Sequence, residues 1–124
     1  MKRCLETREL VAPAIPFEIE PALREVDFGE WEGKTLDWAE RNAAELLSHR
    51  RRDPVRFRPP GGESIEDAAV RLGLLAKELR ERRRTLVIAH RLSLGILERL
   101  LRGLPLDTKH VVQLEPGEFR VVLR

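Results

Sequence analysis

Residues 85–104 constrain the fold of this chain most, because the apolar pattern changes from one type to another within a few positions. Residues 86–89 (Leu-Val-Ile-Ala) form an uninterrupted apolar run after a block of charge, which is typical of a strand buried on both faces. From Leu92 onward, apolar residues recur at helical spacing until Gly103 ends the pattern. The stretch therefore predicts a central strand that leads directly into a helix, with His90 at the junction.

His90 is a candidate functional residue because of this position. Ligands of open α/β sheets bind at the carboxyl ends of strands, and the start of a helix adds free N–H groups and the positive end of the helix dipole. The pattern thus predicts an anion near His90. The alternative, from this segment alone, is an ordinary loop histidine whose ring is satisfied by the backbone.

Helical periodicity elsewhere predicts helices over residues 3–11, 36–49 and 65–83. Ser64 followed by Asp67 is close to a capping box, which marks the start of the last of these helices. Between the first two helices, the segment is dense in acidic, aromatic and glycine residues, as loops that carry function often are.

Short alternating patterns predict strands in addition to the buried one. Residues 17–20 alternate apolar and polar side chains, and residues 111–114 and 119–123 flank a Pro-Gly turn signal, which predicts a hairpin. Strands interleaved with helices predict an α/β fold.

Length and composition place limits on the class of protein. A chain of 124 residues with 42% hydrophobic and 35% charged residues is one domain, residues 1–124, with room for a core. No apolar run approaches the roughly 20 residues of a membrane span, and the first residues lack the apolar segment of a signal peptide, which predicts a cytoplasmic protein with no membrane partner. A single cysteine, Cys4, excludes an internal disulfide and a cysteine-based metal site. No histidine and carboxylate cluster has ligand spacing, so neither a metal nor a cofactor is predicted.

Arginines gather in residues 50–58 and 80–84. Nucleic-acid binding requires basic residues on one face with stacking aromatics, yet only Phe57 lies among them. The overall balance of 23 basic and 21 acidic residues gives a net charge of only +2. We therefore expect solvated surface here and no nucleic-acid partner.

Four segments carry motifs in a recognisable order: residues 3–7 (Arg-Cys-Leu-Glu-Thr), 23–33 (Leu-Arg-Glu-Val-Asp-Phe-Gly-Glu-Trp-Glu-Gly), 60–64 (Pro-Gly-Gly-Glu-Ser) and 87–90 (Val-Ile-Ala-His). Together they resemble the histidine phosphatase superfamily, the phosphoglycerate mutase-like phosphatases that work through a phosphohistidine. The resemblance covers nearly the whole chain. It implies a three-layer phosphoglycerate mutase-like α/β sheet with flanking helices, and a phosphorylated small molecule or phosphate as the ligand.

The resemblance also implies roles for particular residues. Arg3 corresponds to a phosphate-contacting arginine, Glu25 to the proton donor for the leaving oxygen, and His90 to the second histidine of the site. These types suit the chemistry, because a phosphoryl group needs cationic donors and an alkoxide needs an acid. Arg91 stands where the family usually has glycine, and it either adds a cation for phosphate or fills the pocket. The alternatives are a solvated terminal arginine at position 3 and a salt-bridged loop acid at position 25.

One departure from the family pattern is large. The family begins with a strand ending in Arg-His-Gly, whose histidine is the nucleophile, and no Arg-His-Gly occurs in these 124 residues. We therefore expect an N-terminally truncated domain without the first two strands, and weak or no phosphomonoester hydrolysis. The alternative is a non-catalytic module that binds a phosphate ligand or a protein. Loss of those strands would expose a sheet edge, so a homodimer covering that edge is predicted.

Overall fold

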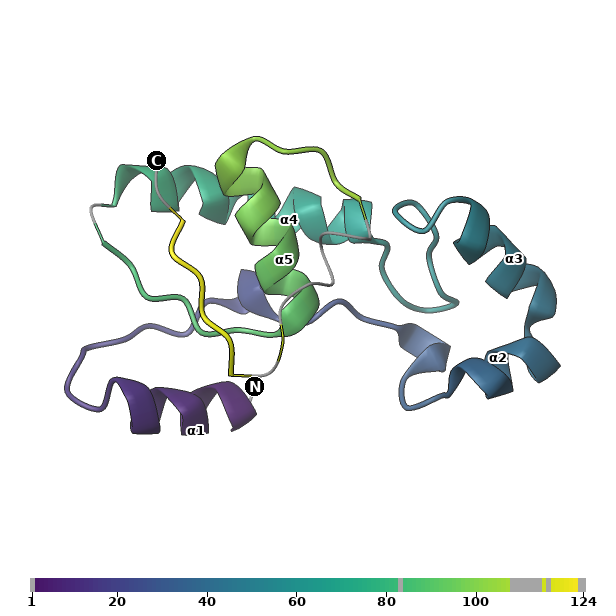
Figure 1. Cartoon of the computed structure of the whole chain (residues 1–124), viewed down its shortest axis with the longest axis horizontal. Coiled ribbons are helices and arrows are strands. Elements are labelled where there is room, and N and C mark those ends of the chain that lie inside the picture. The colour runs from purple at the N-terminus through teal and green to yellow at the C-terminus, as the bar shows by residue number, and fades with distance from the viewer. Residues whose placement is uncertain (1, 83, 108–114, 116, 123–124) are drawn as a thin grey trace.

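The computed structural model describes residues 2–82, 84–107, 115 and 117–122. Within them the chain forms five α-helices and two 3₁₀ turns (Figure 1). Their order is α1 (Lys2–Val11), a 3₁₀ turn (Pro21–Leu23), a second 3₁₀ turn (Gly29–Trp31), α2 (Leu36–Asn42), α3 (Ala44–Arg52), α4 (Ile65–Glu81) and α5 (Arg91–Arg102).

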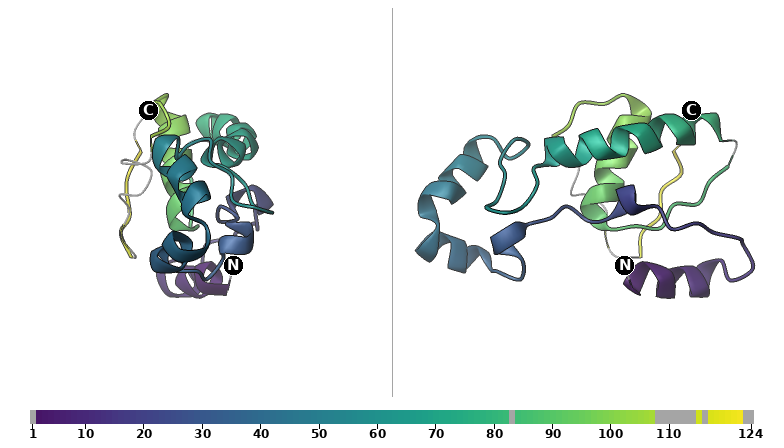
Figure 2. Two further views of the ribbon diagram at one scale, coloured as in Figure 1. Left: turned by 90° about the vertical axis from the view of Figure 1, so that its right-hand side faces the viewer. Right: turned by 180° about the vertical axis from the view of Figure 1, so that it is seen from behind.

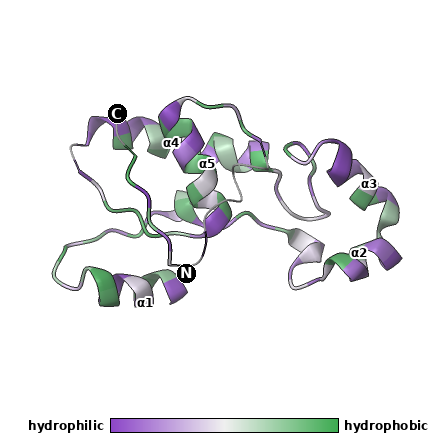
Figure 3. Ribbon diagram, in the orientation of Figure 1, coloured by the Kyte–Doolittle hydropathy of each residue, from purple (hydrophilic) through white to green (hydrophobic). Residues whose placement is uncertain are grey.

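Helices α4 and α5 hold the main core. The predicted capping box is present at the start of α4, where the Ser64 hydroxyl accepts from the Asp67 N–H and the Asp67 carboxylate accepts from the Ser64 N–H. Leu72 of α4 and Ile96 of α5 are fully buried in the shared cluster. Burial of such a side chain stabilises the fold by about 1.5–3 kcal/mol. Both helices carry hydrophilic and hydrophobic residues in alternation around their surfaces (Figure 3).

The other helices lie at the edges of this core. In two views α5 crosses α4, α1 lies on the opposite side of the body from α4, and α2 with α3 occupies one end of the molecule (Figures 1 and 2). A second apolar cluster at that end contains Trp31, Ala39 and Leu47. Phe57 packs against it with its ring 5.2 Å from that of Trp31.

The prediction of a three-layer α/β sheet is wrong for the part of the chain that the structure describes, since that part contains helices and turns but no strand. Residues 17–20 and 86–89 are not paired in a sheet, and Leu86 is 59% exposed. A strand is stable only when its backbone N–H and C=O groups pair with a neighbouring strand. The described residues offer neither segment such a neighbour, so apolar composition alone does not make a sheet.

The structure describes only part of the predicted terminal hairpin. Residues 119–122 are not in a strand, and the partner residues 111–114 lie outside the described residues.

Two of these three predicted helices are present as single helices. The helices predicted over residues 3–11 and 65–83 are confirmed as α1 and α4. The single helix predicted over residues 36–49 is wrong, because the chain breaks at Ala43, where φ is −145°. The Asn42 side-chain amide donates to the Trp38 carbonyl. A side chain that bonds the backbone in this way competes with helical hydrogen bonding at the end of α2. No helix among the described residues is long and apolar enough to cross a membrane.

Candidate functional site

The Glu25 carboxylate is seated on the first turn of α5. Its Oε2 accepts from the Leu92 N–H at 3.2 Å, and its Oε1 accepts from the N–H groups of Ser93 at 3.1 Å and Val26 at 3.0 Å. The fully buried Ser93 hydroxyl lies 3.2 Å from the same Oε1 and donates to the Arg24 carbonyl at 2.5 Å. A helix start has unpaired N–H groups and favours negative charge, so this arrangement fixes the loop acid against α5.

His90 occupies the N-cap position of the same helix. Its backbone is extended, with φ −94° and ψ 162°, and its imidazole makes no capping hydrogen bond. The ring instead meets α1, where Nε2 lies 3.6 Å from the buried Cys4 Sγ. Residues 86 positions apart in the sequence are thus in contact.

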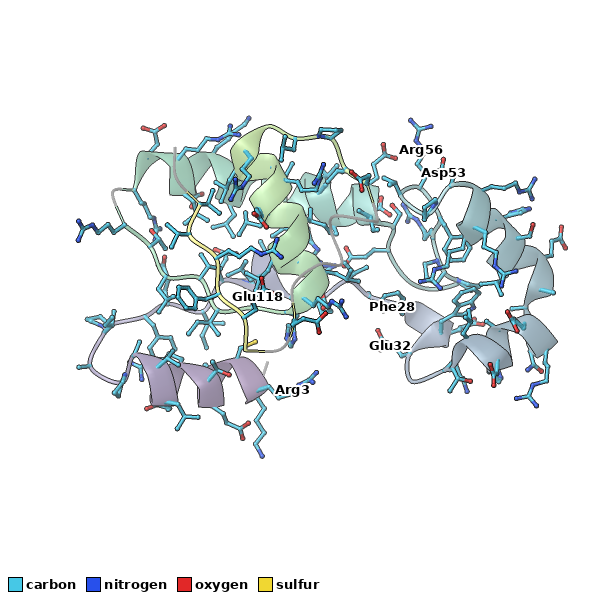
Figure 4. All side chains as sticks on the ribbon, viewed as in Figure 1. Arg3, Phe28, Glu32, Asp53, Arg56 and Glu118 are labelled. Atoms are coloured by element: carbon cyan, nitrogen blue, oxygen red, sulfur yellow. The ribbon has the colours of Figure 1, made fainter. Side chains whose placement is uncertain are left out.

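The two arginines of the predicted site lie in different surroundings. Arg3 precedes Cys4 on α1 and is exposed, at the amino end of that helix (Figure 4). The Arg91 guanidinium lies 3.6 Å from the Glu115 carboxylate, with both side chains largely exposed. The structure therefore places the Glu25 carboxylate on the first turn of the helix whose N-cap is His90, and Arg3 next to the residue that contacts the imidazole. It directs Arg91 toward Glu115.

A buried ion pair holds the loop that carries Glu25. The Arg71 guanidinium of α4 donates to both oxygens of Glu63, at 2.7 and 3.0 Å, and also to the carbonyls of Ala22 at 2.5 Å and Glu25 at 3.3 Å. Arg24 adds a contact to Glu63 Oε2 at 3.3 Å. One guanidinium fork thus links α4 to the chain on both sides of Arg24.

The electrostatics of this pair follow from its geometry. Burial by itself raises the pKa of the Glu63 carboxyl. This effect is outweighed by hydrogen bonds from Arg71 and the Asp27 N–H and by the charges of Arg71 and Arg24. The pKa of Glu63 is therefore below its usual value. Glu63 is therefore an ionised anchor at neutral pH.

Two of the motifs pack backbone against backbone. The Glu30 N–H donates to the Pro60 carbonyl and the Glu63 N–H donates to the Asp27 carbonyl, each at 2.9 Å. A Cβ on Gly29, where φ is +53°, would lie 2.2 Å from the Pro60 carbonyl oxygen, and a Cβ on Gly62 would lie 2.5 Å from the Asp27 carbonyl oxygen. Glycine is required at both positions for this close approach.

A cavity of about 290 Å³ lies beside this loop, and its lining includes Val26 of the main core and Trp31 and Leu47 of the second apolar cluster. Apolar side chains form most of its wall, with contributions from Arg50 and Arg51 of α3. Phe28, at the start of the segment that leads to α2, belongs to this wall and packs against both apolar clusters (Figure 4).

Comparison with known proteins decides the family. The model of the histidine phosphatase superfamily (branch 1) matches residues 1–123. The chain belongs to this superfamily. A 6-phosphofructo-2-kinase/fructose-2,6-bisphosphatase of Gallus gallus is 39% identical over 90 residues, covering 73% of this chain and 19% of that protein. A 2,3-bisphosphoglycerate-dependent phosphoglycerate mutase of Beijerinckia indica is 35% identical over 115 residues, covering 88% of this chain and 55% of that protein.

This member of the histidine phosphatase superfamily thus spans about a fifth of the first relative and about half of the second. Within the described residues, no group of three or more histidine, cysteine or acidic side chains is arranged to hold a metal ion.

Three residues that contact the candidate site were not predicted from the sequence: Cys4, Arg71 and Ser93. Arg71 lies in the first half of α4, whereas Glu63 precedes the Ser64 N-cap, so helical spacing does not predict their pairing. No local signal predicts the contacts of Cys4 or Ser93, because both are made with residues distant in the sequence.

Proposed function

We propose that the chain binds phosphomonoesters at the start of α5, with His90 and Glu25 as the acting groups and Arg3 as the cation for the phosphate. One observation carries the proposal: the Glu25 carboxylate is bound to the N–H groups of Leu92 and Ser93, the second and third residues after the His90 imidazole. Membership of the histidine phosphatase superfamily supports this choice of ligand.

Glu25 is the proposed proton donor, and its two carboxylate oxygens differ in their hydrogen bonds. Oε1 accepts from Val26 and Ser93, whereas Oε2 accepts only from the Leu92 N–H among the described residues. A carboxyl oxygen with one hydrogen bond retains a lone pair that can carry a proton. Oε2 is therefore the atom that would deliver a proton to the leaving oxygen of the ester.

Catalysis in this chain is proposed to be weak or absent, because no Arg-His-Gly nucleophile segment occurs among its 124 residues. Removal of one member of a coupled catalytic group can lower kcat by several orders of magnitude, on the order of 10⁴–10⁶. The same observation favours a second candidate function, a module that binds a phosphate ligand without turning it over.

Calorimetry with inorganic phosphate, together with a turnover assay on a generic phosphomonoester, tests both candidates. We expect saturable phosphate binding that weakens by about tenfold or more in His90→Asn and Arg3→Ala, since each removes a donor to the anion. Lys77→Ala removes an exposed cation from α4 and is the matched control. Binding with turnover that is lost in His90→Asn supports the enzyme, binding without turnover supports the module, and unchanged binding in both site variants contradicts the site.

A homodimer is proposed on the basis of exposed apolar surface rather than of a sheet edge. Leu10, Ile19 and Leu86 are 84%, 62% and 59% exposed. These three side chains are the exposed apolar surface that we propose a second copy covers. Sedimentation at micromolar concentration is expected to show a dimer, and a single monomeric species would contradict it.

A further inference from the structure

A second cavity, of about 570 Å³, has two segments of open chain in its wall. Residues 16–20 and residues 84–88 all line it, and neither segment contains a helix, turn or bend. The backbone groups of residues 85–88 make no hydrogen bond within the part of the chain that the structure describes. An extended segment placed between the two walls would therefore find backbone N–H and C=O groups to pair with.

The lining of the second cavity is largely apolar. Helices α1 and α4 contribute Leu5, Leu75 and Leu79 to it. Ile19 and Leu86, one from each open segment, also line it and are 62% and 59% exposed. Removing such side chains from water is favourable, so the cavity fits an occupant that presents apolar side chains on one face.

Residues 117–122 form a segment with matching properties. Phe119 and Val121 are 84% and 65% exposed, and their backbone groups make no hydrogen bond among the described residues. The segment lies at the outer edge of the molecule in the left view of Figure 2, and none of its residues lines the second cavity of its own chain. Aromatic and β-branched residues favour strands, so this segment has a strand-like composition without a strand partner.

Charge is also complementary between this segment and the cavity wall. In an extended chain, Glu118 and Arg120 lie on the face opposite the two apolar side chains. The wall offers Arg84 from one open segment and Glu20 from the other. Arg84 is exposed and forms no ion pair within the described residues. The acid and the base of the segment therefore each find the opposite charge in the wall.

We infer that the homodimer forms by exchange of this segment, so that residues 117–122 of one copy enter the second cavity of the other and pair with residues 85–88. The inference rests on the proposed homodimer and specifies its contact. Insertion breaks the ion pair of Arg120 with Glu98, now 3.2 Å long, and brings Arg120 to the acidic side of the wall. Under two-fold symmetry each copy gives one segment and receives one, so both cavities are filled.

Disulfide cross-linking of the intact chain tests this contact. Val121→Cys is mixed in turn with Thr85→Cys, Leu86→Cys and Val87→Cys and then oxidised. We expect an intermolecular disulfide in at least one mixture, because paired strands bring opposite Cα atoms to about 4.5–5.5 Å, the separation that a disulfide requires. The matched control is Val121→Cys with Leu74→Cys, since Leu74 is 69% exposed on α4 and lies outside the cavity. Cys4 is buried and is present in every variant.

Sedimentation equilibrium supplies an independent measurement. Val121→Asp places a charge on the apolar face of the segment and should raise the Kd of the dimer by about tenfold or more. Leu74→Asp should change this Kd by less than about twofold. Both side chains are exposed, so neither substitution removes a core contact.

The outcomes separate the inference from the proposed homodimer. A dimer in which no wall cysteine is joined to Val121→Cys, or which the two aspartate variants weaken equally, overturns the inference alone. A single monomeric species at micromolar concentration overturns the inference and the homodimer together. The phosphate-binding proposal is tested separately by calorimetry and does not depend on either result.

Discussion

At the scale of single residues, the contacts of Glu25 and Gly29 matter most. The carboxylate of Glu25 accepts from three backbone N–H groups and so joins a loop to the first turn of α5. Gly29 lets that loop touch the Pro60 backbone, a contact in which no side-chain atom takes part. The Glu25 carboxylate binds backbone N–H groups and Gly29 lies against backbone atoms, so both contacts depend on where the tertiary structure places the main chain.

Gly29→Ala is expected to destabilise the protein by more than about 2 kcal/mol, because a Cβ would collide with backbone atoms that cannot rotate away. Gly33→Ala is the matched control, since φ there is +68° but nothing lies within 4 Å of the added carbon. Urea unfolding of both variants measures the difference. A loss in Gly29→Ala no larger than that in Gly33→Ala would mean that the two loops are not in this contact.

At the scale of elements, α4 organises the molecule. Its start is fixed by the Ser64 and Asp67 capping box, its inner face supplies Leu72 to the core, and Arg71 on its first half holds the Glu25 loop. Its contacts with α5 then place the start of α5 against Glu25. One helix thus links the core to the candidate site.

Opposite stability changes are expected from two substitutions in or beside α4. Ser64→Ala removes the cap and should lower the free energy of unfolding by about 1 kcal/mol. Gly73→Ala lies within the helix with nothing within 4 Å of the added carbon, and should raise the free energy of unfolding by about 0.5–1 kcal/mol. Thermal unfolding followed by circular dichroism would show the two signs, and changes of the same sign would contradict this assignment of α4.

At the scale of the whole molecule, the buried pair of Glu63 and Arg71 makes stability depend on pH. The pKa of Glu63 is lower in the folded protein than its ordinary value, despite burial, because Arg71 and the Asp27 N–H favour the ionised form. The stabilisation is therefore complete above the ordinary pKa of a glutamate and is lost as pH falls through the folded pKa.

Glu63→Gln should test this dependence, since it keeps the shape and removes the charge. The difference in unfolding free energy between the unmodified protein and Glu63→Gln should be largest near neutral pH and should shrink as the solution is acidified. Glu45→Gln changes an exposed carboxylate on α3 and serves as control. Urea titrations at several pH values supply the measurement, and a difference that does not change with pH would contradict the role of Glu63.

The sequence predicted the helices of this protein better than its strands. Periodicity identified α1, α4 and α5 because each helix makes its own backbone hydrogen bonds, so that its pattern is local. The strand predicted at residues 86–89 was wrong because a strand depends on a partner that local composition does not specify. The break at Ala43 was missed for a similar reason, since apolar spacing continues through it.

The family follows from motifs in a fixed order along the chain, and the capped helix after Ser64 follows from its local pattern. Folding alone brings Glu25 to the first turn of α5, Cys4 to His90, and Val26 and Leu92 into the wall of one cavity. The physical reason is distance along the chain. These contacts join residues about 67 to 86 positions apart, so no local pattern in the sequence specifies them.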